Sequence, residues 1–106
     1  MRHEIKLPRY IQLAGLRISI KSGDKVSREL KGRNVFGSCG YTDKERFFIK
    51  LDPMVGKRKF SETTCHEFFE AINTIYLDGE LKHREISGLA RGFHQILEQL
   101  KVRFVE

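Results

Sequence analysis

The spacing of apolar residues changes from a period of two to a period of 3.6 near Asp52-Pro53, and this change limits the possible folds most strongly. Before it, residues 9–13 and 16–21 alternate apolar and polar side chains, which is the pattern of half-buried strands. After it, apolar residues recur at helical spacing in two long stretches. Strands followed by helices predict an α+β fold, because alternating βαβ units would interleave the two patterns.

Four strands are expected before that change, and we predict that they form one small antiparallel sheet. Their residues are 9–13, 16–21, 35–41 and 46–51. Ala14-Gly15 joins the first two strands, because glycine tolerates the positive φ of a tight turn. The polar residues 22–34 are expected to form a loop. Gly37 and Gly40 weaken the third strand, which indicates a bulge or a close approach to its backbone.

The first of two packed helices is expected to begin after a basic loop at residues 54–60. Ser61 is its expected N-cap, because a serine hydroxyl accepts a hydrogen bond from the first turn. Its apolar stripe is Cys65, Phe68, Phe69, Ile72, Ile75 and Tyr76. Asp78-Gly79 is expected to end the helix, since glycine is common just after a helix C-terminus.

The second helix is expected at about residues 84–101, where apolar residues again recur at helical spacing. Gly88 and Gly92 lie one turn apart on it and lower its helix propensity. We expect these two glycines to let the helix pack closely against its neighbour.

The length and composition of the chain predict one domain without a membrane span. A chain of 106 residues suffices for a single domain and is too short for two. Residues 1–53 would form its strand-rich part, and residues 60–101 its two-helix part. No apolar run approaches the roughly 18 residues needed to cross a bilayer, and no apolar stretch follows the charged residues 1–6 as in a secretory signal. We therefore expect a cytosolic protein in which Cys39 and Cys65 are reduced.

The basic residues are concentrated in the first part of the chain. Residues 1–59 contain 15 of the 20 Lys and Arg residues and 6 of the 14 Asp and Glu residues, a net charge of +9. The remaining residues have a net charge of −3. A basic half favours nucleic acid or acidic partners through long-range attraction. The alternative is that these residues only line solvent-facing strand positions, since no nucleic-acid motif accompanies them.

The stretch from Thr64 to Asn73, with the sequence TCHEFFEAIN, contains the most informative polar residues. His66 and Glu70 are one helical turn apart on nearly the same face, so an imidazole and a carboxylate can bind one cation together. Glu67 is placed as in the H-E-x-x-H helix of zinc peptidases, where this carboxylate is the general base. We therefore predict a zinc site with His66 and Glu70 as ligands and Glu67 as the catalytic residue. Glu70 replaces the second histidine of that motif and is a harder ligand.

A third protein ligand is needed, and two histidines are candidates. His83 lies three residues before Ile86 and so continues the inward stripe of the second helix. His94 shares roughly the same face three turns further along, and is the alternative if the helices pack in another register. The motif and the third ligand each have an ordinary explanation without a metal. A short H-E-x-x-E sequence occurs by chance in charged helices, and a histidine at a helix N-terminus commonly makes an ordinary hydrogen bond.

Several segments taken together indicate a family. They are Leu7-Pro8-Arg9-Tyr10-Ile11 with Ala14-Gly15, Gly40-Tyr41-Thr42-Asp43, Thr64 to Asn73, His83-Arg84-Glu85-Ile86, and Leu89 to Leu97. This pattern resembles small phage and prophage proteins known as zincin-like metallopeptidases, and the likeness runs from about Pro8 to Leu100. Many members have H-E-x-x-H, and a subset has H-E-x-x-E-A-I-N as here.

The resemblance implies a minimal zincin-like fold and a location in the host cytoplasm. It also implies Zn²⁺ held by His66, Glu70 and His83, with Glu67 as general base and a peptide or protein as substrate. We therefore expect a zinc-dependent metallopeptidase. The alternative is a non-catalytic binding module of the same fold, which contacts nucleic acid or a host protein and has a structural or vestigial metal site. A fold alone does not establish turnover.

Overall fold

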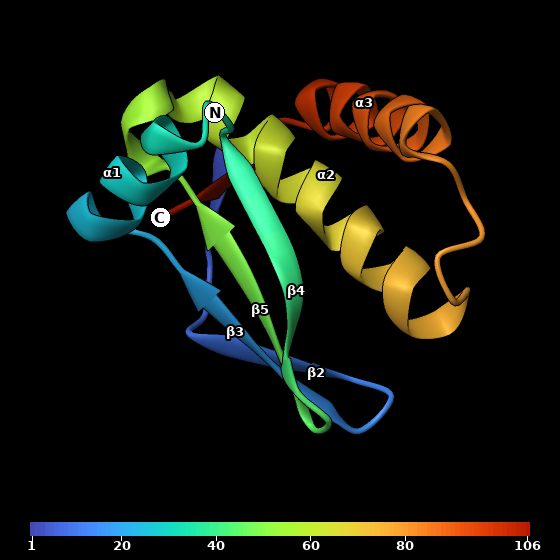
Figure 1. Ribbon diagram of the computed structural model, residues 1–106. Helices are drawn as coiled ribbons and strands as arrows, with labels where there is room; N and C mark the ends of the chain where they lie inside the picture. The colour runs from blue at the N-terminus through green and yellow to red at the C-terminus, as the bar shows by residue number, and fades with distance from the viewer.

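Six strands and three α-helices follow one another as β1-β2-β3-α1-β4-β5-α2-α3-β6 (Figure 1). The computed structural model describes residues 1–106. The strands are β1 His3–Lys6, β2 Tyr10–Leu13, β3 Leu16–Lys21, β4 Gly37–Asp43, β5 Arg46–Leu51 and β6 Val102–Val105. The helices are α1 Asp24–Gly32, α2 Lys57–Tyr76 and α3 His83–Gln99, with a 3₁₀ turn at Pro53–Val55. The predicted α+β class is therefore confirmed.

Strands β2 to β5 form one sheet in the order β2-β3-β5-β4. The outer pairs β2–β3 and β4–β5 are antiparallel hairpins, but the central pair β3–β5 is parallel. The prediction of an entirely antiparallel sheet was therefore wrong at its centre. The reason is α1, which carries the chain from the end of β3 to the far edge of the sheet, so that β5 returns beside β3 in the same direction.

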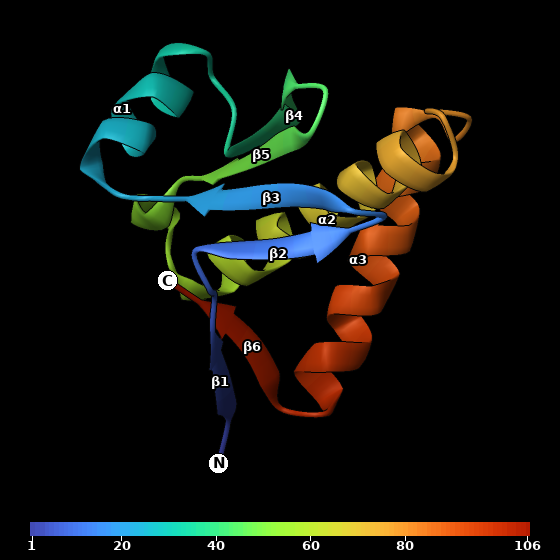
Figure 2. The ribbon, with the colours of Figure 1, turned by 90° about the horizontal axis from the view of Figure 1, so that it is seen from below.

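The main core lies between one face of this sheet and α2. Alternate residues of the central strands point to this face, and Ile18, Phe47 and Ile49 are fully buried. Phe60 and Ala71 of α2 pack on them in the same cluster. This packing fixes the direction of α2 along the sheet (Figures 1 and 2).

Residues 22–34 were predicted to be a loop, but most of them form α1. Its apolar residues Val26 and Leu30 are one turn apart, and Leu30 is fully buried at the end of the sheet. Two apolar positions in nine residues are a weak signal among so many charges. The helix is therefore stabilised by packing against the sheet, which its own sequence does not indicate.

Helix α2 begins at Lys57, so the basic residues expected in a loop form its first turn. Its N-cap is Gly56, and the predicted cap at Ser61 was wrong. The Ser61 hydroxyl instead accepts a hydrogen bond from the backbone N–H of Phe104, at 3.0 Å, and so joins α2 to β6.

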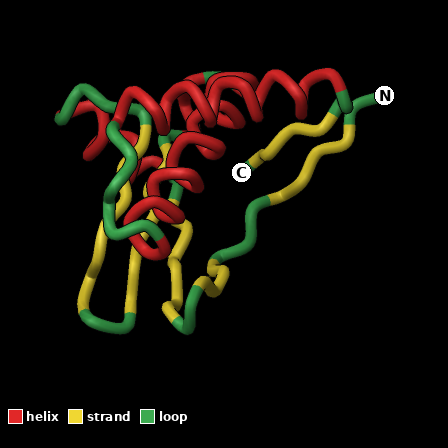
Figure 3. Tube along the Cα trace, turned by 90° about the vertical axis from the view of Figure 1, so that its right-hand side faces the viewer, coloured by secondary structure: helices red, strands yellow, loops and turns green.

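The two ends of the chain pair with each other, which the sequence did not reveal. Strands β1 and β6 form a two-stranded parallel sheet in which His3 lies opposite Val102 (Figure 3). A second, smaller core beneath β6 contains Cys65, Ala90 and Leu97 from the two long helices. The strand-rich part of the fold therefore extends beyond residues 1–53, and the chain after residue 101 contributes a strand.

Three further expectations can be compared with the structure. Cys39 and Cys65 are both unpaired, as predicted. None of the helices is long and apolar enough to cross a membrane. Gly88 and Gly92, by contrast, do not contact a neighbouring helix, because a Cβ built at either position would meet nothing within 4 Å.

Candidate metal centre

Helix α2 carries the predicted site residues past the edge strand β4. Its closest approach is at Gly37, where a Cβ would lie 2.8 Å from a methyl carbon of Thr63 and 2.9 Å from a carboxylate oxygen of Glu67. Only a glycine leaves room for both side chains at this distance. The expectation that Gly37 marks a close approach is thus confirmed, and the contact places the Glu67 carboxyl group under β4.

His83 is the first residue of α3, and the turn before it directs this residue back toward α2. The side-chain amide of Asn73 holds that turn through both backbone polar groups of Leu81. Its oxygen accepts a hydrogen bond from the Leu81 N–H at 3.0 Å, and its nitrogen donates one to the Leu81 carbonyl at 3.1 Å. Glu85 then accepts a hydrogen bond from the Lys82 N–H at 2.8 Å and caps the helix start.

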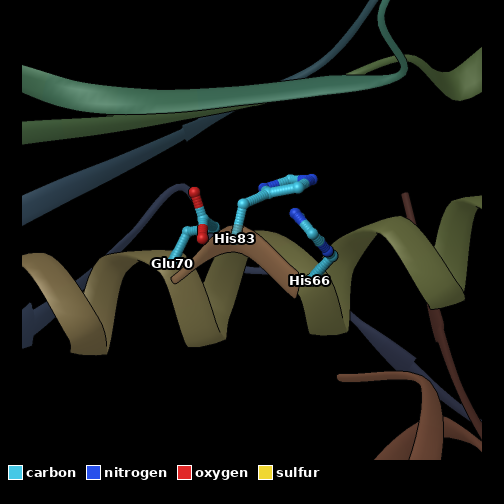
Figure 4. Close-up of side chains that lie close together, drawn as sticks. All are labelled: His66, Glu70 and His83. Atoms are coloured by element: carbon cyan, nitrogen blue, oxygen red, sulfur yellow. The ribbon is translucent and has the colours of Figure 1, made fainter. Parts of the chain in front are cut away.

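The structure brings His66, Glu70 and His83 together. One ligand atom of each side chain lies within 4.8 Å of those of the other two, and the two imidazole rings have centroids 5.1 Å apart (Figure 4). Ligands at 2.0–2.1 Å from a tetrahedral zinc ion are separated by about 3.3 Å. Small side-chain rotations would therefore be enough to close these three groups around an ion.

The chemistry of the donors also fits a transition metal. Two imidazoles and one carboxylate form a ligand set found in catalytic zinc sites, which retain one coordination position for water or substrate. His83 is exposed, while His66 and Glu70 are half-buried, so the pocket is open on one side. We conclude that these residues could hold a metal, and zinc is the ion proposed below.

His94, the alternative third ligand, lies elsewhere. It is eleven residues beyond His83 on α3, or about 16 Å along the helix axis. Its side chain is 3% exposed, and its Nε2 atom has no hydrogen-bond partner. Burial lowers the pKa of its imidazole, and the charged groups that affect this pKa most are Glu98 and then Glu62, neither of which belongs to the cluster. The register of the two helices thus selects His83 and excludes His94 from the cluster.

The protonation states of the site residues follow from their burial. Burial lowers the pKa of His66, opposed by the nearby carboxylate of Glu70, so its imidazole is neutral at pH 7 and able to bind a metal. Burial raises the pKa of Glu67 to about 7. A carboxyl group with this pKa can both accept and donate a proton near neutral pH.

Cys39 is a member of the site that the sequence did not identify. Its thiol lies beside Glu67, and hydrogen bonding from it partly offsets the increase in the pKa of Glu67. Burial and the neighbouring carboxyl groups raise the pKa of Cys39 well above its ordinary value, so the thiol stays protonated. Its position on β4 gave no signal, because only the pairing of β4 with β5 and the packing of α2 bring it to Glu67.

One cleft of about 490 Å³ lies between β4, α2 and the first half of α3. It is lined by the three candidate ligands, Glu67 and Cys39. Its rim combines apolar side chains with Lys59, Arg91 and the acidic Glu62, whose carboxylate lies 3.7 Å from the Lys59 ammonium group. Phe36 is half-exposed at one end, with the ammonium group of Lys59 at 5.2 Å from the centre of its ring. Arg91 lines the opposite wall and forms no ion pair. A small peptide therefore fits the size of the cleft, and an acidic group of that peptide suits the unpaired Arg91.

Comparison of the chain with protein-family models, curated proteins and solved structures found no match. The resemblance to zincin-like phage proteins accordingly stays a prediction from the sequence motifs. The function is inferred below from the site itself.

Proposed function

We propose that the protein is a zinc-dependent hydrolase of peptide bonds with a zincin-like site. The observation that carries this proposal is the cluster of His66, Glu70 and His83 in a cleft that also contains a buried carboxyl group of raised pKa. A structural metal site needs no such cleft and no such carboxyl group. Their combination is what a hydrolytic site requires.

The three ligands and Glu67 would have separate roles. His66, Glu70 and His83 would hold the ion, with Glu70 in place of the more usual second histidine. Bound zinc supplies two things, a lowered pKa for water and polarisation of the substrate carbonyl. Glu67 would accept a proton from the attacking water and return it to the departing amine, for which a pKa of about 7 is suitable.

Strand β4 would position the substrate. It is an edge strand of the sheet, and its residues 37–39 line the cleft. The unpaired backbone groups of an edge strand can form hydrogen bonds with an extended peptide. Arg91 on the rim, which forms no ion pair, would favour a peptide with an acidic side chain. Of the basic segment at residues 54–60, only Lys59 lines the cleft.

We place the protein in the cytosol, which is the host cytoplasm if the source is a phage. Two unpaired cysteines support this, because reducing compartments keep thiols free. The partner is then a cytosolic peptide or protein.

The first test is metal content, measured by mass spectrometry on protein purified without an affinity tag. We expect about one zinc ion per chain, and its loss in His66→Ala. Absence of metal even after incubation with excess zinc would contradict the proposal.

The second test is hydrolysis of a fluorogenic peptide library by the zinc-loaded protein. Glu67→Gln should retain zinc and lose hydrolysis, because the amide cannot accept the proton. Retained hydrolysis in this variant would exclude the proposed role of Glu67. Bound zinc that raises the melting temperature without any cleavage would indicate a structural ion.

A further inference from the structure

The face of the four-stranded sheet that points away from α2 is basic and contains one exposed and one half-buried aromatic ring. In Figure 2 the sheet lies in front of α2, so this face is toward the viewer. Register places Arg17 opposite Arg46, and the alternation along each strand directs both away from the core. The residues that matter on this face are Tyr10, Arg17, Lys21, Arg46, Phe48 and Lys50.

Two aromatic rings on this face lie against cations. The guanidinium carbon of Arg17 is 3.9 Å from the centre of the Tyr10 ring, and the Lys50 ammonium is 5.1 Å from that of Phe48. Phe48 lies opposite Gly40 of β4, where a Cβ would be 3.4 Å from its ring, so its partner residue on β4 has no side chain to cover it. Tyr10 is 51% exposed. Tyr10 thus offers an exposed ring beside a positive charge, and the half-buried Phe48 offers part of a second ring beside Lys50.

A hollow of about 590 Å³ adjoins that tyrosine, between β2, β3 and the start of α1. It is lined by Arg9, Lys21 and Lys25, none of which forms an ion pair. One carboxylate, that of Glu106, also lines it and accepts a hydrogen bond from Ser22. Three free cations around one carboxylate leave the hollow positively charged.

The carboxylates near the sheet face neutralise only part of its charge. Glu29 pairs with Lys50 at 2.8 Å, and Asp43 lies 3.8 Å from Arg46. Arg17 and the three cations of the hollow stay unpaired. The acidic residues of the metal centre lie on the other side of the sheet with α2. The positive charge of this sheet face and its hollow is therefore displayed on a surface separate from the cleft.

We infer that this surface binds single-stranded nucleic acid. Its phosphates contact Arg9, Lys21, Lys25 and Arg17, and its bases stack on Tyr10 and Phe48. A charged track with interspersed aromatic rings is how proteins bind single strands without reading sequence, because every base has a face that can stack. A duplex would hide those faces, and an acidic protein would leave the two rings unused. The inference is independent of the proposed hydrolase.

The test uses the full chain and a fluorescein-labelled oligothymidylate of about 12 nucleotides, with binding followed by fluorescence anisotropy. We expect binding at about 50 mM salt that weakens steeply as salt is raised. A chelator or the Glu67→Gln substitution should not change it. Thermal unfolding of each variant confirms that it is folded.

Two variants separate the contributions of stacking and charge. Tyr10→Ala should weaken binding at least about fivefold, the equivalent of one lost stacking contact. Lys21→Ala with Lys25→Ala should lower the slope of log affinity against log salt by about 1.4. The matched control is Arg84→Ala with Lys101→Ala, which removes the same charge from the α3 region and should leave the slope nearly unchanged.

Three outcomes would overturn the inference. One is no binding at about 50 mM salt. Another is an equal loss in the control pair, which would mean that net charge alone is responsible. The third is a duplex or polyglutamate bound as tightly as the single strand, with Tyr10→Ala having no effect, which would assign the surface to another polyanion.

Discussion

The imidazole rings of His66 and His83 lie with their centroids 5.1 Å apart, although they belong to different helices. Neither helix alone creates this pair. The turn before α3 must direct its first residue toward the middle of α2, and the cluster with Glu70 exists only because it does. The site therefore depends on ligand identity and also on the register of two helices, and the two can be tested separately.

Ligand identity is tested by comparing His83→Ala with His94→Gln. Loss of a residue that only supports a ligand typically lowers metal affinity 10- to 100-fold, so removing His83 should lower zinc affinity by at least about tenfold. His94 lies outside the cluster, and its substitution should change zinc affinity little. Competition with a chromophoric chelator measures both. A larger loss in the His94 variant would mean that the helices pack in the other register.

Register is tested at Asn73, which contacts no ligand but holds Leu81 by two hydrogen bonds. Asn73→Ala should lower the free energy of unfolding by about 1–3 kcal/mol, because it leaves backbone groups without partners. It should also weaken zinc binding, since His83 follows the released turn. Thr74→Ala is the control, as that hydroxyl bonds only to the Glu70 carbonyl within α2. Equal zinc affinities in the two variants would show that the turn does not position His83.

The fold could be predicted where its signals are local. Strands β2 and β3 follow from alternation, and β4 and β5 were expected close to their observed residues. The long helices follow from their apolar stripes, with boundaries shifted by a few residues at α2. Strands β1 and β6 were missed because each is completed by residues at the other end of the chain. The parallel pairing of β3 with β5 was missed with α1, whose two apolar residues give little periodicity.

The residues of the candidate site show the same difference between local and long-range signals. His66, Glu67 and Glu70 lie within one and a half turns of one helix, so sequence spacing alone relates them. The choice between His83 and His94 needed the turn between the helices. The place of Cys39 in the site depends on the pairing of the sheet and on the packing of α2. Nothing near it in the sequence indicated the contact with Glu67.

The approach of α2 to β4 can be tested at Gly37. A Cβ there would lie 2.8 Å from Thr63 and 2.9 Å from Glu67, closer than side chains tolerate. Gly37→Ala should therefore cost about 1–3 kcal/mol of unfolding free energy through overpacking. Gly40→Ala is the matched control on the same strand, since its Cβ would meet Phe48 at 3.4 Å, close to ordinary contact. Urea denaturation of both variants measures the two costs. Equal costs would refute the close approach of α2 to β4.

At Gly88 and Gly92 a glycine-to-alanine substitution should stabilise the fold, in contrast to Gly37. Both are exposed inside α3, and a Cβ would meet nothing within 4 Å. Alanine is favoured over glycine in a helix interior by about 0.8–1.0 kcal/mol. Each Gly→Ala substitution should raise the free energy of unfolding by roughly that amount, and thermal unfolding would measure it. Gly79→Ala should instead destabilise, because its φ of +73° disfavours a Cβ. Loss of stability at position 88 or 92 would indicate a helix contact that the structure lacks.

His94 should make the stability of the fold depend on pH. Burial lowers its pKa below the ordinary value of 6.5, an effect only partly opposed by the nearby carboxylate of Glu98. The unfolded chain therefore binds a proton at this residue before the folded chain does. Its contribution to stability is complete above about pH 6.5 and is lost as the pH falls toward the lowered pKa. Within that window the loss approaches about 1.4 kcal/mol per pH unit.

The variant His94→Leu removes this titration and places an apolar side chain of similar size at the same buried position. Urea denaturation of both proteins with a chelator present, at pH 7.5 and at pH 5, separates His94 from the other groups that titrate there. We expect the wild type to lose more stability than the variant between these two pH values. Parallel losses would mean that His94 accepts a proton in the folded state as readily as in the unfolded one. Its Nε2 would then have access to water or to an acceptor that the buried position in α3 does not provide.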